Sequence, residues 1–256
     1  MQRSFFAHAR HFLGQLALAL ATVATIGFTV DHVHPVYADR APVVRRLLTS
    51  AWRDSVAMRA PWIQESPEAA MQTEQFDADR QAFAEDLLRT GRLDSTRADS
   101  LAGYAVREAY KRRLPPALVF GVMLTENDDF DSSARSSVGA VGLMQIYPKA
   151  WVHALGPHFG TDLRDDETNV RYGVYILSHL LYGVPDSVAP DSSIRAGLLR
   201  YNGCVHGTNT PHCDRYPDIV RQRIEQLAIA QCGDDGFERC VAQPLRRSLD
   251  ESWAAW

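Results

Sequence analysis

Apolar residues recur with the spacing of α-helices along most of the chain from Phe76 onward. Phe83, Leu87 and Leu88 mark the first predicted helix. Further helices are predicted over 98–112, 116–126, 148–154, 167–181, 193–201 and 216–230. Alternation typical of strands is absent, although a short hairpin fits the Asp, Ser and Gly cluster between 130 and 139. The pattern therefore predicts a mainly α fold.

A different pattern occupies the N-terminus, where Leu13–Val30 carries no charged residue. Arg3 and Arg10 precede this segment and Asp31 follows it, which is typical of an export segment whose N-terminus stays in the cytoplasm. Its length suffices to span a bilayer as a helix, and Val36-Tyr37-Ala38 resembles a cleavage site. We expect a signal sequence or an inner-membrane anchor over 1–38, and a protein in the periplasm or cell envelope. A buried helix of a cytosolic protein is the alternative.

The 256 residues suffice for one domain with additional segments. Prolines and an amphipathic pattern over Val43–Met58 indicate a helical spacer over 39–95. The continuous helical patterns define a main domain over 96–232, and a tail over 233–256 follows.

Composition excludes some classes of function. Apolar residues make up 46% and charged residues 23%, as in ordinary globular proteins. The net charge is −4, and the basic residues form no run that would suggest a polybasic tract, so the sequence does not indicate nucleic-acid binding.

The four cysteines fall into two close pairs, Cys204 with Cys213 and Cys232 with Cys240. Four cysteines allow three pairings, of which pairing between neighbours is the simplest. Zinc is the competing interpretation, but the sequence has no C-x-x-C, and His206 and His212 lack a matching second half-site. We therefore expect disulfides, an oxidising compartment and no metal site.

Glu126 ends the predicted helix 116–126, which is apolar on nearly every face and should be buried. Burial disfavours an ionised carboxylate and raises its pKa, as a general acid at neutral pH requires. The alternative is that Glu126 is simply the first exposed residue past the helix.

The segment from Ser136 to Pro148 combines small and apolar residues. Gly139 and Gly142 permit backbone conformations that other residues avoid. Gln145 offers both a donor and an acceptor, which suits sugar hydroxyl or acetamide groups. Alone, this segment is equally consistent with a tight turn.

Together, these residues resemble the soluble lytic transglycosylase (SLT) domain. The resemblance begins with Glu126, Phe130, Ala134, Ser136 and then Gly139-Ala140-x-Gly142-Leu143-Met144-Gln145-x-x-Pro148. It continues in family order with Asn169-Val170-x-x-Gly173, Arg200-Tyr201-Asn202-Gly203, and Tyr216 with Val220. It covers about 114–230. The ordered combination is specific, whereas no single motif would be.

The resemblance implies a lysozyme-like fold for the main domain and assigns roles by position. Glu126 matches the catalytic acid/base, and Tyr201 matches a tyrosine close to that carboxylate, accompanied by Asn202. Positions matching groove residues that touch the glycan are Ser136, Gln145 and Tyr147. Asn169 is expected to be a helix N-cap or a buried support.

The sequence departs from the family pattern at three places. Asn127 stands where the family usually has Ser, and Asp128-Asp129 replaces a single position. Ile176 stands where the family helix usually has Tyr.

The implied reaction cleaves the MurNAc–GlcNAc β-1,4 bond of peptidoglycan glycan strands and forms a 1,6-anhydromuramic acid end. It needs one carboxylate and neither a metal nor an organic cofactor. A hydrolytic muramidase of the same fold is one rival, because Asp128, Asp129 or Asp131 could hold a water. A non-catalytic glycan-binding module is the other rival.

Overall fold

The computed structural model describes residues 61–64, 66–182, 190–204 and 212–253. The apolar segment 13–30, the predicted helix 43–58 and the export segment 1–38 lie outside this set. Among the residues described, no helix combines the length and hydropathy needed to cross a bilayer.

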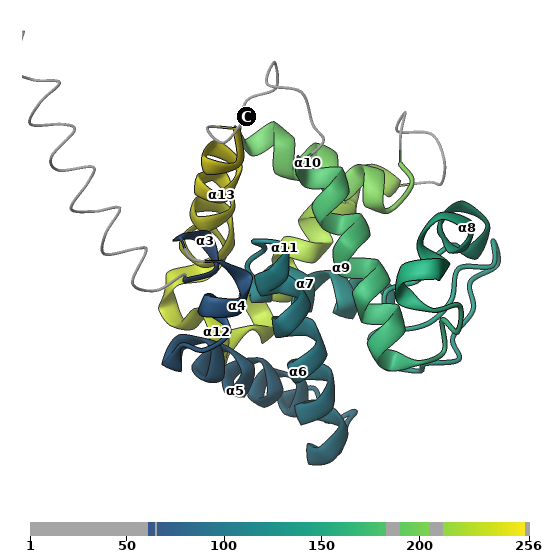
Figure 1. The fold of residues 1–256 in the computed structure, drawn as a ribbon, viewed down its shortest axis with the longest axis horizontal. Helices are drawn as coiled ribbons and strands as arrows, with labels where there is room; N and C mark the ends of the chain where they lie inside the picture. Colours follow the sequence, from purple (N-terminus) through teal and green to yellow (C-terminus); the bar gives the residue numbers. More distant parts are fainter. Residues whose placement is uncertain (1–60, 65, 183–189, 205–211, 254–256) are drawn as a thin grey trace, which may run out of the picture. The chain divides into compact units, whose positions relative to one another are not determined.

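The described residues are helical and contain no strand, so the mainly α prediction is confirmed (Figure 1). Short elements are α3 (Pro61–Gln64), α4 (Pro67–Ala70), η2 (Cys213–Arg215), α12 (Ile229–Cys232), η3 (Gly233–Asp235) and η4 (Glu238–Ala242). The longer helices are α5 (Glu74–Arg89), α6 (Ser95–Lys111), α7 (Pro116–Glu126), α8 (Pro148–Phe159), α9 (Asp166–Tyr182), α10 (Pro190–Tyr201), α11 (Tyr216–Leu227) and α13 (Gln243–Trp253).

Local sequence explains where several helices begin. The side chains of Thr73 and Asp94 accept hydrogen bonds from backbone N–H groups in the first turns of α5 and α6. Pro116 and Pro148 occupy first helical positions, where their missing N–H costs nothing. These signals are local, and the predicted starts agree with the observed ones to within a few residues.

Two helix ends differ from the prediction. Helix α8 continues past 154 to Phe159 and includes Pro157, whereas the sequence pattern predicts an earlier end. The predicted helix 216–230 is divided into α11 and α12, because Ala228 has a non-helical backbone with φ −85° and ψ 50°.

Helix α7 lies at the centre of the core, and every residue from Pro116 to Leu124 is buried. Helices α6 and α11 pack against it. From α5, Phe83 meets Phe120 of α7 edge to face, with 5.4 Å between ring centroids. This packing explains why α7 is apolar on all sides, as the sequence predicts.

The elements outside 96–232 share the same core. Phe83 and Leu87 of α5, and Val241 and Leu245 near the C-terminus, are fully buried in one hydrophobic cluster with α7. In Figure 1, α5 lies beside α6 and α12, in agreement with their packing. The sequence predicts a spacer over 39–95 and a tail over 233–256, but the described parts of both belong to this core. Local patterns do not reveal such long-range packing.

The predicted short hairpin is reduced to two isolated bridges. Val141 pairs with Arg135 and with Ile146, and neither bridge extends into a strand. Gly139 and Gly142 have φ values of +94° and +81°, which interrupt an extended chain at this point.

The cysteines pair between neighbours, as expected from the sequence. Disulfides join Cys204 to Cys213 and Cys232 to Cys240. No free cysteine is present among the described residues.

Candidate active site

Glu126 is the last residue of α7 and is half-buried. Burial raises the pKa of its carboxyl to about 7, while the hydroxyl of Tyr216 partly opposes this rise by donating a hydrogen bond of 2.5 Å to Oε1. The carboxyl is therefore poised to exchange a proton near neutral pH.

Tyr216 reaches Glu126 because α11 crosses α7 at very close range. A Cβ added to Gly121 would lie 2.5 Å from Cγ1 of Ile224, so only glycine permits this approach. Burial raises the pKa of Tyr216 well above its usual range, and the nearby charge of Glu126 adds to this rise. The phenol therefore remains protonated and acts as a donor to the carboxyl.

Tyr201, at the end of α10, has a different partner. Its hydroxyl donates a hydrogen bond of 2.9 Å to the backbone carbonyl of Met144. Burial raises the pKa of Tyr201 strongly, and the charge of Glu126 contributes to the rise. The charge of Glu126 therefore acts on Tyr201. The hydrogen bond of Tyr201, however, holds the segment 136–148, which contains Gly139 and Gly142 and is called the glycine-rich segment below.

The loop after Glu126 is fixed by the side chain of Asn127. Its Nδ2 donates hydrogen bonds to the carbonyls of Asp131 and Gly142, at 2.8 and 3.2 Å, and its Oδ1 accepts from the N–H of Asp131. Phe130 is fully buried despite a φ of 54°. Asn127, which departs from the family pattern, therefore connects this loop to the glycine-rich segment.

Asn169 of α9 holds the glycine-rich segment from the other side. Its Oδ1 accepts from the N–H of Met144 at 2.8 Å, and its Nδ2 donates to the carbonyls of Val141 and Leu163. A Cβ at Gly142 would lie 2.2 Å from this Nδ2, and one at Gly173 would lie 2.2 Å from the sulfur of Met144. Asn169 is therefore a buried support, one of the two roles expected for it.

Gln145 has a φ of 47°, a conformation that non-glycine residues rarely adopt. Its side-chain Nε2 donates a hydrogen bond of 2.8 Å to the carbonyl of Gly142, and the residue is half-buried. Backbone strain of this kind is often found at functional sites. Its carbonyl Oε1 has no hydrogen bond to the described residues.

The other residues predicted to contact the glycan lie on the surface or within the glycine-rich segment. The hydroxyl of half-buried Ser136 accepts from the N–H of Ala140 at 3.0 Å. Tyr147 is 39% exposed immediately before α8, and Asn202 is exposed immediately after α10. Within the described parts of the chain, no hydrogen bond joins any of these three predicted residues to Glu126.

Comparison with models of known families identifies one domain in the chain. The model of the transglycosylase SLT domain matches residues 103–204. The chain therefore contains a transglycosylase SLT domain. No curated protein and no solved structure matches the chain significantly. The SLT domain indicates a glycan-cleaving function of the lytic transglycosylase type, with peptidoglycan glycan as its substrate class.

Tyr216 lies outside the matched part of the SLT domain, and the sequence identifies it only as the start of a closing helix. The structure shows it as the hydrogen-bond donor to Glu126. The two residues are 90 positions apart, and neither the helical pattern nor the motif that contains Tyr216 predicts this contact.

The other carboxylates near Glu126 in sequence form ion pairs or hydrogen bonds with other residues. Asp128 pairs with Arg223 at 3.0 Å, and Asp129 forms an ion pair with Arg92. Hydrogen bonds from Ser133 lower the pKa of Asp131. Among the described residues of the SLT domain and its surroundings, no cluster of His, Cys, Asp and Glu could hold a metal ion.

Proposed function

We propose that this protein is a peptidoglycan lytic transglycosylase. It would cleave the MurNAc–GlcNAc β-1,4 bond and form 1,6-anhydromuramic acid, with Glu126 as the single acid/base. The observation that carries this proposal is the raised pKa of Glu126, about 7, beside the phenol of Tyr216. The SLT domain match supports the same class of reaction.

In the first step, neutral Glu126 donates its proton to the glycosidic oxygen as the bond to C1 of the muramic residue breaks. The 2-acetamido group supports C1 as an internal nucleophile. In the second step, ionised Glu126 accepts the proton of the 6-hydroxyl as O6 bonds to C1 and the bond between C1 and the acetamido oxygen breaks. The anhydro ring closes and Glu126 is neutral again, so one carboxyl performs both transfers.

Tyr216 and the glycine-rich segment would support these steps. The phenol of Tyr216 stabilises the carboxylate that exists between the two transfers, because a hydrogen bond to a charged acceptor is worth more than one to a neutral acceptor. Positions matching the groove of the family, Gln145 among them, would bind the glycan and hold the reacting bond at Glu126.

Three aspartates close to Glu126 in sequence bear on the rival reaction, hydrolysis by a muramidase. Ordinary glycosidases use two carboxylates on opposite sides of the bond. Asp128 and Asp129 are each held by an arginine, and Asp131 is held by Ser133. Each of the three uses only one carboxylate oxygen for these contacts, so the products of the reaction decide between transglycosylation and hydrolysis.

We also propose that the protein is exported to the periplasm or cell envelope. The uncharged segment 13–30 with arginines before it would serve as a signal sequence or an inner-membrane anchor. The two disulfides support an oxidising compartment.

Mass spectrometry of muropeptides released from purified sacculi tests the reaction. We expect anhydromuramic ends from the wild type, no release from Glu126→Gln, and wild-type products from the control variant Asp129→Asn. Reducing ends would identify a hydrolase. Binding to sacculi without release would identify a glycan-binding module, and activity retained in Glu126→Gln would exclude Glu126 as the acid/base.

A further inference from the structure

The disulfide between Cys204 and Cys213 lies, along the chain, between the two tyrosines that interact with Glu126. Tyr201 comes three positions before Cys204, and Tyr216 comes three positions after Cys213. Both cysteines are buried. The SLT match ends at residue 204, so this bond joins the matched domain to the segment that carries the hydrogen-bond donor to Glu126. A covalent connection therefore lies about one helical turn from that donor.

The Cys204 end of this bond is fixed to helix α10. The N–H of Cys204 donates a hydrogen bond of 2.8 Å to the carbonyl of Leu199, in the last turn of the helix. Tyr201 in the same turn is anchored to the carbonyl of Met144. Helix α10 also packs against α9. The first cysteine is therefore a fixed point, and the narrow geometry of a disulfide fixes the second cysteine beside it.

The Cys213 end of the bond lies at the start of helix α11. Cys213 opens η2, which leads directly into α11 at Tyr216. The later turns of α11 are held without the disulfide, because Val220 and Ile224 are buried where this helix packs against α7. Removal of the disulfide should therefore leave the fold intact and free the first turn of α11, which carries Tyr216.

Arg195 forms a second tie between α10 and the start of α11. Its guanidinium pairs with Asp218 at 2.9 Å and donates to the carbonyl of Asp214 at 2.7 Å. The side chains of Arg195 and Asp218 are both exposed, and water and salt weaken such ion pairs. The disulfide is therefore the stronger of these two ties.

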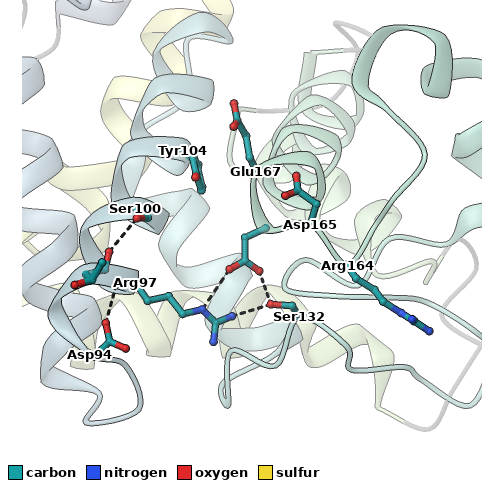
Figure 2. A pocket seen from close by; sticks show the side chains of 10 residues that line it. Asp94, Arg97, Ser100, Tyr104, Ser132, Arg164, Asp165 and Glu167 are labelled. Atoms are coloured by element: carbon teal, nitrogen blue, oxygen red, sulfur yellow. Dashed lines mark hydrogen bonds and ion pairs between the residues drawn. The ribbon is translucent and has the colours of Figure 1, made fainter.

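Glu126 itself is held by contacts that do not involve the disulfide. Its helix, α7, is buried over nearly its whole length. The loop that follows is fastened to α6, because Arg97 donates hydrogen bonds to the hydroxyl of Ser132 at 2.8 Å and to the carbonyl of Phe130 at 2.6 Å (Figure 2). Loss of the disulfide would therefore move Tyr216 relative to a carboxyl that stays in place.

We propose that the Cys204–Cys213 disulfide is a positioning element of the active site, which holds the hydroxyl of Tyr216 in hydrogen-bond contact with Glu126. A hydrogen bond weakens steeply once its length and angle leave a narrow range, so a small shift of the first turn of α11 suffices to lose this contact. The enzyme is then fully active only with the disulfide formed, a consequence that rests on the proposed function.

The ionisation of Glu126 reports this contact. Among the described residues, the titratable groups that interact with its carboxyl are the phenols of Tyr216 and Tyr201. The hydrogen bond from Tyr216 lowers the pKa of Glu126, whereas the hydroxyl of Tyr201 donates to the carbonyl of Met144. Loss of the contact from Tyr216 therefore raises the pKa of Glu126.

The NMR signal of the carboxyl carbon of Glu126 in the full chain, followed over pH, measures this pKa, and the signal lost in Glu126→Gln assigns it. We expect a pKa of about 7 in the wild type. The pair Cys204→Ala and Cys213→Ala should raise it by about one unit, as Tyr216→Phe should. Adding Tyr216→Phe to this pair should give no further rise, because both changes remove the same contact.

The matched control is the pair Cys232→Ala and Cys240→Ala, which removes the disulfide that joins α12 to η4. It should lower Tm and leave the pKa of Glu126 unchanged. A second variant of the first bond, Cys204→Val with Cys213→Ala, refills the space of the sulfur atoms and should give the same rise as the alanine pair. Circular dichroism shows whether each variant is folded.

The proposal is overturned if the pKa of Glu126 keeps its wild-type value without the Cys204–Cys213 bond, if the control pair moves it equally, or if Tyr216→Phe adds a further rise. It is also overturned if neither variant of this bond folds, because the bond would then support the fold as a whole.

The NMR titration needs no substrate, so failure of this inference and failure of the proposed function are distinguishable. The expected rise in a protein that cleaves no glycan would remove only the transglycosylase. Glycan cleavage by the wild type, without a rise in the variants that lack the Cys204–Cys213 bond, would remove only the positioning role of this disulfide.

Discussion

At the scale of single residues, the site depends on two opposing influences on one carboxyl. Burial favours neutral Glu126, and the hydrogen bond from Tyr216 favours ionised Glu126. A pKa of about 7 results, which allows the group to give a proton and take one back. The phenol of Tyr201 also lies close enough to feel the charge of Glu126, but its hydroxyl donates its hydrogen bond to the carbonyl of Met144.

Tyr216→Phe should move the pH dependence of the reaction. Activity requires protonated Glu126, so kcat/KM should fall as pH rises through about 7 in the wild type. Removing the hydrogen bond removes a stabiliser of the ionised form, so the pKa of Glu126 rises. The fall of kcat/KM, the falling limb of the pH profile, therefore moves to higher pH by about one pH unit. Initial rates of muropeptide release between pH 5 and 9 measure this shift.

The contrasting variant for this measurement is Tyr201→Phe. Its lost hydrogen bond is to a backbone carbonyl, so the falling limb should keep its position while KM or stability changes. A limb that stays in place in Tyr216→Phe, or moves equally in both variants, would contradict the assignment of Tyr216 as the partner of Glu126.

Glu126→Gln should also change stability in a pH-dependent way. The folded pKa of Glu126 is raised from 4.5 to about 7, so ionising this group in the folded state costs stability. Below about pH 4.5 the carboxyl is neutral in both states and there is no cost. The cost in stability grows as the pH rises from about 4.5 to about 7, and it is fully present above about pH 7. The gain in Tm from Glu126→Gln should therefore be larger at pH 8 than at pH 4, and an equal gain at both would contradict the raised pKa.

At the scale of elements, the crossing of α7 and α11 determines whether the site exists. Glu126 ends α7 and Tyr216 begins α11, and the two helices come together at Gly121, which packs against Ile224 and the carbonyl of Val220. The sequence predicts both helices. It does not predict their separation, because that depends on two residues meeting across about a hundred positions.

Gly121→Ala should therefore destabilise the protein, whereas Gly103→Ala should not. The new methyl at position 121 would overlap Ile224, at a cost of about 1–3 kcal/mol in the free energy of unfolding. At Gly103, in the middle of α6, nothing lies within 4 Å of an added Cβ. Alanine there should raise the free energy of unfolding by about 0.5–1 kcal/mol. Urea unfolding of both variants measures these changes, and equal effects would contradict the close crossing.

At the scale of the whole molecule, residues before and after the SLT match complete the core. Helix α5 is fastened to α12 by Asp86, which is fully buried. Its carboxylate oxygens accept hydrogen bonds from the N–H groups of Ala230 and Gln231, at 2.7 and 3.1 Å, and from the side chain of Gln231. Since α12 also carries Cys232 of the second disulfide, this contact connects the N-terminal helices to the C-terminal part of the described chain.

Asp86→Ala should lower the free energy of unfolding by about 1–3 kcal/mol, because it leaves partly buried N–H groups at the start of α12 without their acceptor. The control Asp77→Ala removes an exposed carboxylate of the same helix and should change stability by about 0.5 kcal/mol or less. Denaturant unfolding measures both variants. A similarly small effect at position 86 would contradict the role of Asp86 in joining α5 to α12.

The sequence by itself determined the local features: the helices with their apolar faces and proline starts, and the apolar character of helix 116–126 up to Glu126. It made pairing between cysteines eight and nine positions apart the simplest choice, and the structure has this pairing. It also supplied the ordered motifs that resemble the SLT domain. These features follow from residues close together in the chain, whose spacing directly sets which groups can meet.

Only the tertiary structure decided which distant groups meet. It made Tyr216 the hydrogen-bond partner of Glu126 and joined the hydroxyl of Tyr201 to the backbone carbonyl of Met144. It also brought α5 and the C-terminal helices into the core. The physical reason is that such contacts depend on helix packing at separations of tens of residues, where a gap as small as the missing Cβ of Gly121 determines the distance between two side chains.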